Sequence, residues 1–276
     1  LGSTRARHGA RDATRLVHAA VDAGIRMFDT ADAYGSGASE LALGEALSGR
    51  SDDVVVATKV GYRFDERRPG LASDVIGAVA RRLGRGTRPY AEQDFSVAGV
   101  ERAVVGSLRR LRRDHLDLLQ FHGPPIATST DLPEAVQRLI DAGTVRWFGV
   151  GCERLDVADS WVGVGGLATI QLPFGVLDPQ AATGAIAVAH QRDVGIIARG
   201  VLGGGILARA VRGQPTGLDA VRHGHVERLQ QLAAASGVDL LQLAMWYGRV
   251  RADPDVVLIG MSNEDQVAGT IRRFDA

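Results

Sequence analysis

Short apolar runs rich in valine, isoleucine and leucine alternate with longer segments of helical periodicity along nearly the whole chain. A strand of a parallel sheet is buried on both faces and reads as a continuous apolar run, whereas the helix after it carries one apolar stripe. The alternation therefore predicts repeated strand-helix units around one parallel sheet. Seven strands are predicted, at residues 25–29, 54–59, 116–121, 145–150, 168–172, 195–198 and 256–259.

Repetition of this unit over 276 residues predicts the α/β class and a (β/α)8 TIM barrel, a fold that typically takes about 250 residues. We expect a single domain over residues 1–276. Residues 1–4 precede the first helical segment, 12–23, where the first strand of such a barrel belongs. We interpret them as the remnant of that strand, which is then incomplete in this sequence.

One predicted connection, residues 61–95, is longer than the connections between strands and helices usually are. It follows the second predicted strand and is interrupted by glycines and prolines. Loops that follow barrel strands lie at the catalytic face. We therefore expect this loop to cover the barrel mouth and to take part in substrate selection.

Charge and composition narrow the class of ligand. The 32 basic and 32 acidic side chains cancel, which argues against nucleic acid or an anionic membrane and favours a small-molecule partner. No run approaches the ~18 apolar residues of a membrane span. Cys152 is the single cysteine, so no intrachain disulfide can form, and we expect a cytoplasmic protein.

Segment 100–113 repeats apolar residues at helical spacing as far as Leu111 and carries arginines at the remaining positions: Arg102, Arg109, Arg110, Arg112 and Arg113. Cations suit a solvated helix face and the end of a helix. We therefore expect these arginines in solvent on the outside of the barrel, rather than in a phosphate or nucleic-acid site.

Polar side chains stand where three predicted strands end. Asp29, Lys59 and His122 each follow an apolar run, and Tyr34 comes five residues after Asp29 in a turn of small residues. Because the carboxyl ends of barrel strands meet at one mouth, we expect the four to converge. A phenol, with an ordinary pKa of about 10, becomes an effective acid at neutral pH when an ammonium stabilises its anion.

In this interpretation Lys59 supplies that ammonium and Asp29 holds it charged and oriented, while His122 hydrogen-bonds the substrate oxygen or assists proton delivery. Purely structural roles compete with it: a salt-bridged rim pair, a tyrosine packed in a loop and a satisfied core imidazole. A lyase or aldolase that uses Lys59 as a Schiff-base nucleophile is a second alternative, although that role requires a lysine without a carboxylate partner.

Three segments resemble the aldo-keto reductase family: Phe28-Asp29-Thr30-Ala31-Asp32-Ala33-Tyr34-Gly35, Ala57-Thr58-Lys59-Val60-Gly61, and Asp117-Leu118-Leu119-Gln120-Phe121-His122. The resemblance runs in register from about residue 12 to residue 266. It implies an enzyme in which hydride passes from NADPH, bound across the barrel mouth, to a carbonyl carbon while Tyr34 protonates the oxygen. Asp29, Tyr34, Lys59 and His122 form the implied catalytic set, and no metal is needed.

The same resemblance implies a set of cofactor contacts after the later strands. Family members often carry an arginine or lysine where Ser262 stands, so NADH remains an alternative to NADPH. Where the family usually places Ser-Asn, this chain has Gly151-Cys152, so the nicotinamide ring is expected to depend more on Gln171 and on backbone groups. The implied cofactor-binding residues are Asp29, Cys152, Gln171, Arg199, Gly200, Leu202, Gly203, Gly260, Ser262, Asn263 and Gln266.

The leading hypothesis is thus an oxidoreductase that converts an aldehyde, ketone or keto-sugar to an alcohol, with a role in specialised metabolism. Two alternatives keep the same residues: a redox-neutral epimerase or lyase that uses the nicotinamide transiently, and a regulatory barrel that binds the cofactor without turnover. A reactive thiol at Cys152 is a further alternative. The substrate, the physiological direction and the oligomeric state are left open.

Overall fold

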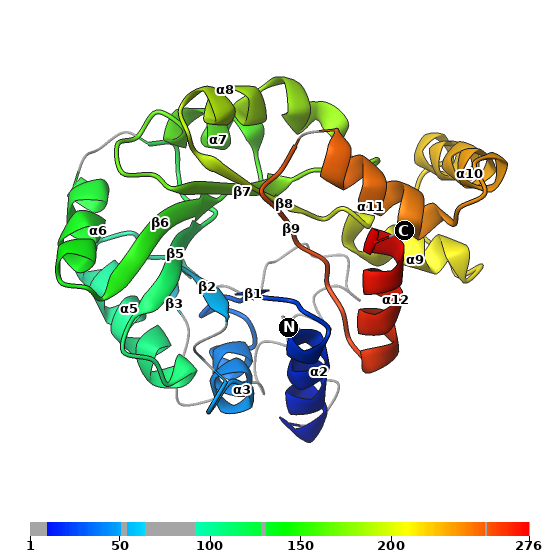
Figure 1. The fold of residues 1–276 in the computed structure, drawn as a ribbon. Helices are drawn as coiled ribbons and strands as arrows, with labels where there is room; N and C mark the ends of the chain where they lie inside the picture. The colour runs from blue at the N-terminus through cyan, green and yellow to red at the C-terminus, as the bar shows by residue number, and fades with distance from the viewer. Residues whose placement is uncertain (1–9, 51–53, 64–91, 128–130, 252, 276) are drawn as a thin grey trace.

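The computed structural model describes residues 10–50, 54–63, 92–127, 131–251 and 253–275. Its main feature is a parallel sheet of seven strands in the order β1-β2-β5-β6-β7-β8-β9, which curls so that helices cover its outer side (Figure 1). Each predicted strand is present, so the seven-strand prediction is confirmed. The strands are β1 Met27–Asp29, β2 Val55–Val60, β5 Leu116–His122, β6 Val145–Gly151, β7 Thr169–Pro173, β8 Gly195–Arg199 and β9 Val256–Val257.

A helix follows almost every strand, because each apolar stripe packs against the outer face of the sheet. Two further helices, α9 and α10, lie between β8 and β9 and pack with α11 around a smaller apolar cluster that includes Leu207, Val226 and Leu240. The helices are α2 Ala10–Asp22, α3 Ala38–Ala46, α5 Val97–Leu111, α6 Asp131–Asp141, α7 Leu155–Trp161, α8 Ala185–Gln191, α9 Ile206–Val211, α10 Ala220–Ala235, α11 Leu240–Val250 and α12 Glu264–Asp275, with short 3-10 turns η2 Pro179–Thr183 and η3 Gly203–Gly205.

The first strand is shorter than predicted, and the end of the preceding helix explains it. Gly24 adopts a left-handed conformation (φ 87°), and the amide of Ile25 donates to the carbonyl of Ala20. This is the hydrogen bonding of a glycine-terminated helix, so Ile25 is used to end α2 and cannot begin β1. Residues 1–4, the predicted strand remnant, lie outside the described residues.

The ends of the predicted long loop 61–95 pair with each other. Strand β3 (Tyr62–Arg63) runs antiparallel to β4 (Glu92–Gln93), with Tyr62 opposite Gln93. Residues 64–91 are not among those described, so the coverage of the barrel mouth by this loop stays a prediction. Within the described ranges, none of the helices combines the length and the apolar character that crossing a membrane requires.

The inside of the curled sheet has an apolar floor beneath a polar layer. Side chains two apart on a strand share a face, so Ala57 lies on the same face as Lys59 and Leu118 on the same face as Gln120. Ala57, Leu118 and Ile197 form a buried cluster of their own, separate from the large core between sheet and helices. Lys59 and Gln120, two residues further along these strands, therefore lie directly above an apolar layer at the carboxyl end of the barrel.

Candidate active site

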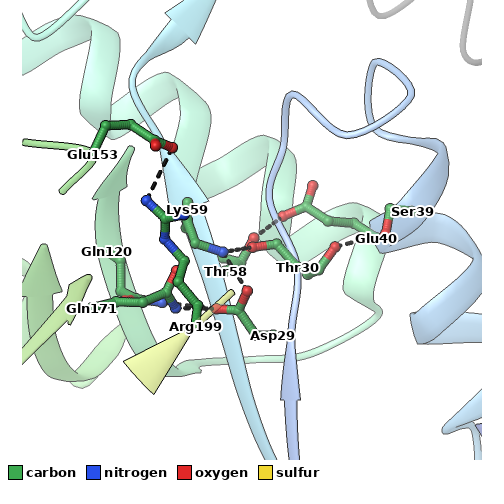
Figure 2. A network of polar contacts seen from close by, with 10 residues as sticks. All are labelled: Asp29, Thr30, Ser39, Glu40, Thr58, Lys59, Gln120, Glu153, Gln171 and Arg199. Atoms are coloured by element: carbon green, nitrogen blue, oxygen red, sulfur yellow. Dashed lines mark hydrogen bonds and ion pairs between the residues drawn. The ribbon is translucent and has the colours of Figure 1, made fainter. Parts of the chain in front are cut away.

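The centre of the polar layer is the carboxylate of Asp29, at the end of β1. The Nζ atom of Lys59 lies 2.5 Å from its Oδ2 atom and also donates to the carbonyl of Thr30 at 2.9 Å (Figure 2). Only 2% of the Lys59 side chain is exposed. A buried ammonium is costly without a partner, and here the carboxylate and a carbonyl oxygen supply one.

Two amide side chains complete the hydrogen bonding of Asp29. Gln120, from β5, donates through Nε2 to Asp29 Oδ1 at 3.0 Å, and Gln171, from β7, donates to the same oxygen at 2.9 Å. These strands are far apart in sequence and are brought together by the curl of the sheet (Figure 2). The carboxylate is therefore held from both oxygens and can keep the Lys59 ammonium in one orientation.

Tyr34 and His122 lie next to this pair. The Nζ atom of Lys59 is 5.3 Å from the centroid of the Tyr34 ring, and the rings of Tyr34 and His122 meet edge to face with centroids 5.6 Å apart. The four predicted residues thus converge as expected. A fifth, Tyr62 of β3, was not predicted and packs edge to face on His122 at 5.0 Å.

The loop that carries Tyr34 rests on a buried polar network. Arg110 on α5 donates to Glu40 at 2.7 Å, and the hydroxyl of Thr58 donates to the other carboxylate oxygen at 2.5 Å. Glu40 has no exposed surface and Arg110 only 6%. The expectation that Arg110 is solvated was therefore wrong, because α3 supplies a carboxylate on the face of α5 that packs inward. It was also wrong for Arg113, whose side chain is 10% exposed and lies 3.2 Å from a carboxylate oxygen of Asp117.

Gly37 shows how closely this network supports the loop. Its φ of 87° is left-handed, and a Cβ atom there would stand 2.7 Å from Cδ of Arg110. Only glycine satisfies both the backbone conformation and the contact. The turn of small residues before α3 is therefore a requirement of packing as well as of chain reversal.

A cavity of about 510 Å³ opens beside Asp29 and Tyr34. Apolar residues of α2, β9 and α12 form most of its wall, and Gln171, Arg199, Gly200 and Gly260 line it as well. Gly200 has φ 72° and open space where a Cβ atom would stand. Four of the predicted cofactor contacts therefore line one cavity with Asp29 and Tyr34. The apolar part of its wall is formed by α2 and α12 next to β1 and β9, the two edge strands of the described sheet.

The guanidinium of Arg199 is held at the rim of this cavity. It donates to the carbonyl of Cys152 at 2.9 Å and lies 3.0 Å from a carboxylate oxygen of Glu153. Leu202 and Gly203 follow in the next turn, which includes η3, and do not line the cavity. Arg199 is accordingly oriented towards the mouth by the segment that follows β6.

The last three predicted cofactor contacts, Ser262, Asn263 and Gln266, lie around the start of α12. Both the amide and the hydroxyl of Ser262 donate to Gln266, at 2.8 and 3.1 Å, and the amide of Gln266 donates to Asn263 at 2.9 Å. All three are exposed and tied to one another. They lie outside the cavity wall, on the segment that continues from Gly260.

Cys152 is located differently from the other predicted contacts. Its side chain has no exposed surface and belongs to the main apolar core, so only its carbonyl reaches the site, through Arg199. Burial raises the pKa of the Cys152 thiol from 9.0 to about 12, although the charge of Arg199 acts in the opposite direction. The thiol is therefore protonated at neutral pH, which disfavours the reactive-cysteine alternative.

We expect Cys152 in the folded protein at pH 8 to react with a thiol reagent about a thousandfold more slowly than in the unfolded chain, because each pKa unit lowers the thiolate fraction about tenfold. The measurement compares labelling rates with and without guanidinium chloride. Rapid stoichiometric labelling of the folded chain would contradict this placement of the thiol.

The described residues contain no group of three His, Cys, Asp or Glu side chains arranged to hold a metal ion. The arrangement instead supports proton transfer. It combines a phenol beside an ammonium whose charge a carboxylate balances, an imidazole whose ring meets the phenol edge to face, and a cavity that the carboxylate and the phenol both line.

Comparison with known proteins agrees with this geometry. The model of the Aldo/keto reductase family matches residues 1–276. A curated relative, the D-threo-aldose 1-dehydrogenase of a Pseudomonas species, is 33% identical over 211 residues, covering 72% of this chain and 62% of the dehydrogenase. The chain spans between 52% and 62% of the length of three curated relatives that it matches, this one included.

Solved structures share the fold. Aldo-keto reductase AKR11C1 from Bacillus halodurans, in its holo form, superimposes with a TM-score of 0.80 and 28% identity, covering 97% of this chain and 83% of that chain. An aldo-keto reductase from Klebsiella pneumoniae in complex with NADPH gives a TM-score of 0.70 at 22% identity, covering 98% and 82%, which is a likeness of fold alone. The predicted (β/α)8 barrel is thereby confirmed.

Proposed function

The chain belongs to the aldo/keto reductase family, and on this premise we propose that it reduces the carbonyl group of an aldehyde, a ketone or a keto-sugar with NADPH. The convergence at the barrel mouth carries the proposal: Lys59 Nζ lies 2.5 Å from Asp29 and 5.3 Å from the ring centroid of Tyr34, and the His122 ring meets that ring edge to face. Such a set provides a proton where an alkoxide forms.

The side chains divide the work of proton delivery. Tyr34 gives its hydroxyl proton to the carbonyl oxygen as that oxygen becomes an alkoxide, and the Lys59 ammonium stabilises the tyrosinate that remains. Asp29 keeps the ammonium charged and in place, and His122 orients the substrate oxygen towards Tyr34. Bound NADPH supplies the hydride that reaches the carbonyl carbon.

The cavity residues fit a nicotinamide dinucleotide. Gln171 presents an amide that can pair with the carboxamide of the ring, and it lines one cavity with Asp29 and Tyr34. Arg199 is the residue that we expect to meet the pyrophosphate, with backbone approach at Gly200 and Gly260. Cys152 would contribute through its carbonyl, and Leu202, Gly203, Ser262, Asn263 and Gln266 would hold the remainder of the cofactor.

The position of Lys59 weighs against the Schiff-base alternative. Its amine is 2% exposed and engaged with Asp29 and the carbonyl of Thr30, whereas a nucleophilic lysine needs a free, uncharged amine that the substrate can reach. We therefore retain carbonyl reduction. The small carbonyl compound as partner and the cytoplasmic location are retained as predictions with it, as is a role in specialised metabolism.

The test begins with fluorescence titrations of the protein with NADPH and with NADH. We expect micromolar binding of NADPH and about tenfold weaker binding by Arg199→Met, because a charge-assisted contact to phosphate is lost. Arg146→Met, which removes an exposed arginine near the start of β6, is the matched control and should leave the affinity unchanged.

A binding-competent protein is then assayed with a panel of aldehydes, ketones and aldoses, following oxidation of NADPH by absorbance. Turnover of at least one carbonyl supports the proposal. Absence of binding by either nucleotide would overturn it, and tight binding with no turnover across the panel would favour the regulatory alternative.

A further inference from the structure

The two amide side chains that donate to Asp29, Gln120 and Gln171, differ in their access to the cavity. Both side chains are buried, with 1% of Gln171 and none of Gln120 exposed. Of the two only Gln171 lines the cavity that we assign to the cofactor, whereas Gln120 stands between Lys59 and Gly149 in the strand register. Both donate to the same oxygen, Oδ1 of Asp29 (Figure 2). One donor can therefore turn to a ligand, and the other cannot leave the barrel interior.

Burial of the Gln120 amide at this position costs free energy. Its Oε1 atom is buried and has no hydrogen-bond partner in the part of the chain that the structure describes, so the bond to Asp29 is the one that the amide makes there. An unsatisfied buried oxygen costs free energy that an apolar side chain of the same length would avoid. A contribution to packing alone does not account for an amide at this position.

We propose that Gln120 is a positioning residue, which retains Asp29 in its orientation towards Lys59 when the bound nicotinamide takes over the amide of Gln171. The inference rests on the proposed function, since it needs a cofactor in the cavity. Without Gln120, engagement of Gln171 by the cofactor leaves Oδ1 of Asp29 with neither amide donor. Cofactor binding and the alignment of Lys59 with Tyr34 are thereby coupled through a residue that touches neither the cofactor nor the substrate.

Gln120→Met tests the coupling because methionine keeps the length and removes the donor. We expect the dissociation constant for NADPH to rise about tenfold to a hundredfold and kcat to fall by a similar factor, the scale of one hydrogen bond to a charged group. Leu119→Met, a buried neighbour on the same strand that faces the outer core, should leave both unchanged.

A double-mutant cycle separates positioning from a general loosening of the barrel. In Gln171→Met the cofactor no longer competes for an amide of Asp29, so adding Gln120→Met should leave the NADPH affinity unchanged. A purely structural role would weaken binding by the same factor in both backgrounds. That additive result would overturn the proposal, as would wild-type affinity in Gln120→Met.

Gln120→Glu provides a second variant of nearly unchanged shape. The new carboxyl group faces Asp29 and Lys59, and two adjacent carboxylates cannot both ionise readily. At low pH the added group is protonated and donates to Asp29, so we expect near wild-type NADPH affinity and thermal stability of the cofactor-free protein there. Both should decline relative to wild type as the pH rises, and an affinity and stability deficit independent of pH would contradict the proposal.

The outcomes also separate this inference from the proposed function. Failure of the wild-type protein to bind either nucleotide would remove the proposed function, whereas normal wild-type binding with no response to Gln120→Met would remove only the positioning role. In either case the cofactor-free unfolding profile of Gln120→Glu reports on its own whether Gln120 and Asp29 are coupled.

Discussion

Tyr34→Phe is expected to lower turnover by about a hundredfold or more, the scale of general acid catalysis, while leaving the affinity for NADPH nearly unchanged. The substitution removes one oxygen atom and keeps the ring that packs against His122 and lies above the Lys59 ammonium. The loss should appear in kcat, because the proton is needed only as the alkoxide forms. Steady-state rates with the best carbonyl of the panel provide the measurement.

Tyr62→Phe is the matched control for that experiment. Tyr62 also packs edge to face on His122 and also loses a single hydroxyl, but it lies on β3, outside the four residues to which the chemistry is assigned. We expect turnover within about threefold of wild type, the modest range for an effect outside the chemistry. Equal losses in the two variants, or wild-type turnover in Tyr34→Phe, would contradict the assignment of Tyr34 as the proton donor.

Arg110→Met is expected to lower the free energy of unfolding by about 3–5 kcal/mol, which is the cost of leaving one partner of a buried ion pair uncompensated. Glu40 has no exposed surface and would retain only the hydroxyl of Thr58 as a donor among the contacts described above. Urea denaturation followed by circular dichroism measures the change.

Two further variants test whether loss of the Arg110–Glu40 ion pair causes the predicted fall in stability. Arg109→Met alters the exposed neighbour on α5 and should change stability by less than about 0.5 kcal/mol. Adding Glu40→Gln to Arg110→Met removes the uncompensated charge and should recover a large part of the loss. A small effect of Arg110→Met alone would mean that the network does not support the Tyr34 loop as described.

The two predictions are connected through the loop between β1 and α3. Its polar anchors are Ser39 and Glu40, at the start of α3. Glu40 binds side chains of β2 and α5, and Ser39 pairs with Thr30 of the loop at 2.8 Å. A destabilised anchor should therefore loosen the position of Tyr34 as well as the fold. Residual activity in Arg110→Met, measured well below its unfolding temperature, should fall without any change in the chemical groups at the site.

The pattern of apolar runs was sufficient to predict the sheet and the end of it at which the candidate site residues meet. Strands of a parallel sheet are buried on both faces, so their continuous apolar runs stand out from the amphipathic helices without knowledge of any contact. The same rule locates Asp29, Lys59 and His122 at strand ends, and the geometry of a barrel requires strand ends to meet. The start of β1 was predicted too early, at Ile25, because an isoleucine is equally compatible with the first position of a strand and with the end of a glycine-terminated helix.

Side-chain partners, in contrast, depended on the tertiary structure. Gln120 and Gln171 are 91 and 142 residues from Asp29, and their shared bond to one oxygen depends on how far the sheet curls. Helical spacing shows which residues share a face of α5, but it does not show what packs against that face. The burial of Arg110 was therefore not predicted, because its partner Glu40 is 70 residues away in the sequence. Burial of Cys152 followed in the same way from the packing of distant elements. Periodicity reflects local backbone geometry, whereas the energy of a buried polar group depends on its partners, and only the folded chain brings these together.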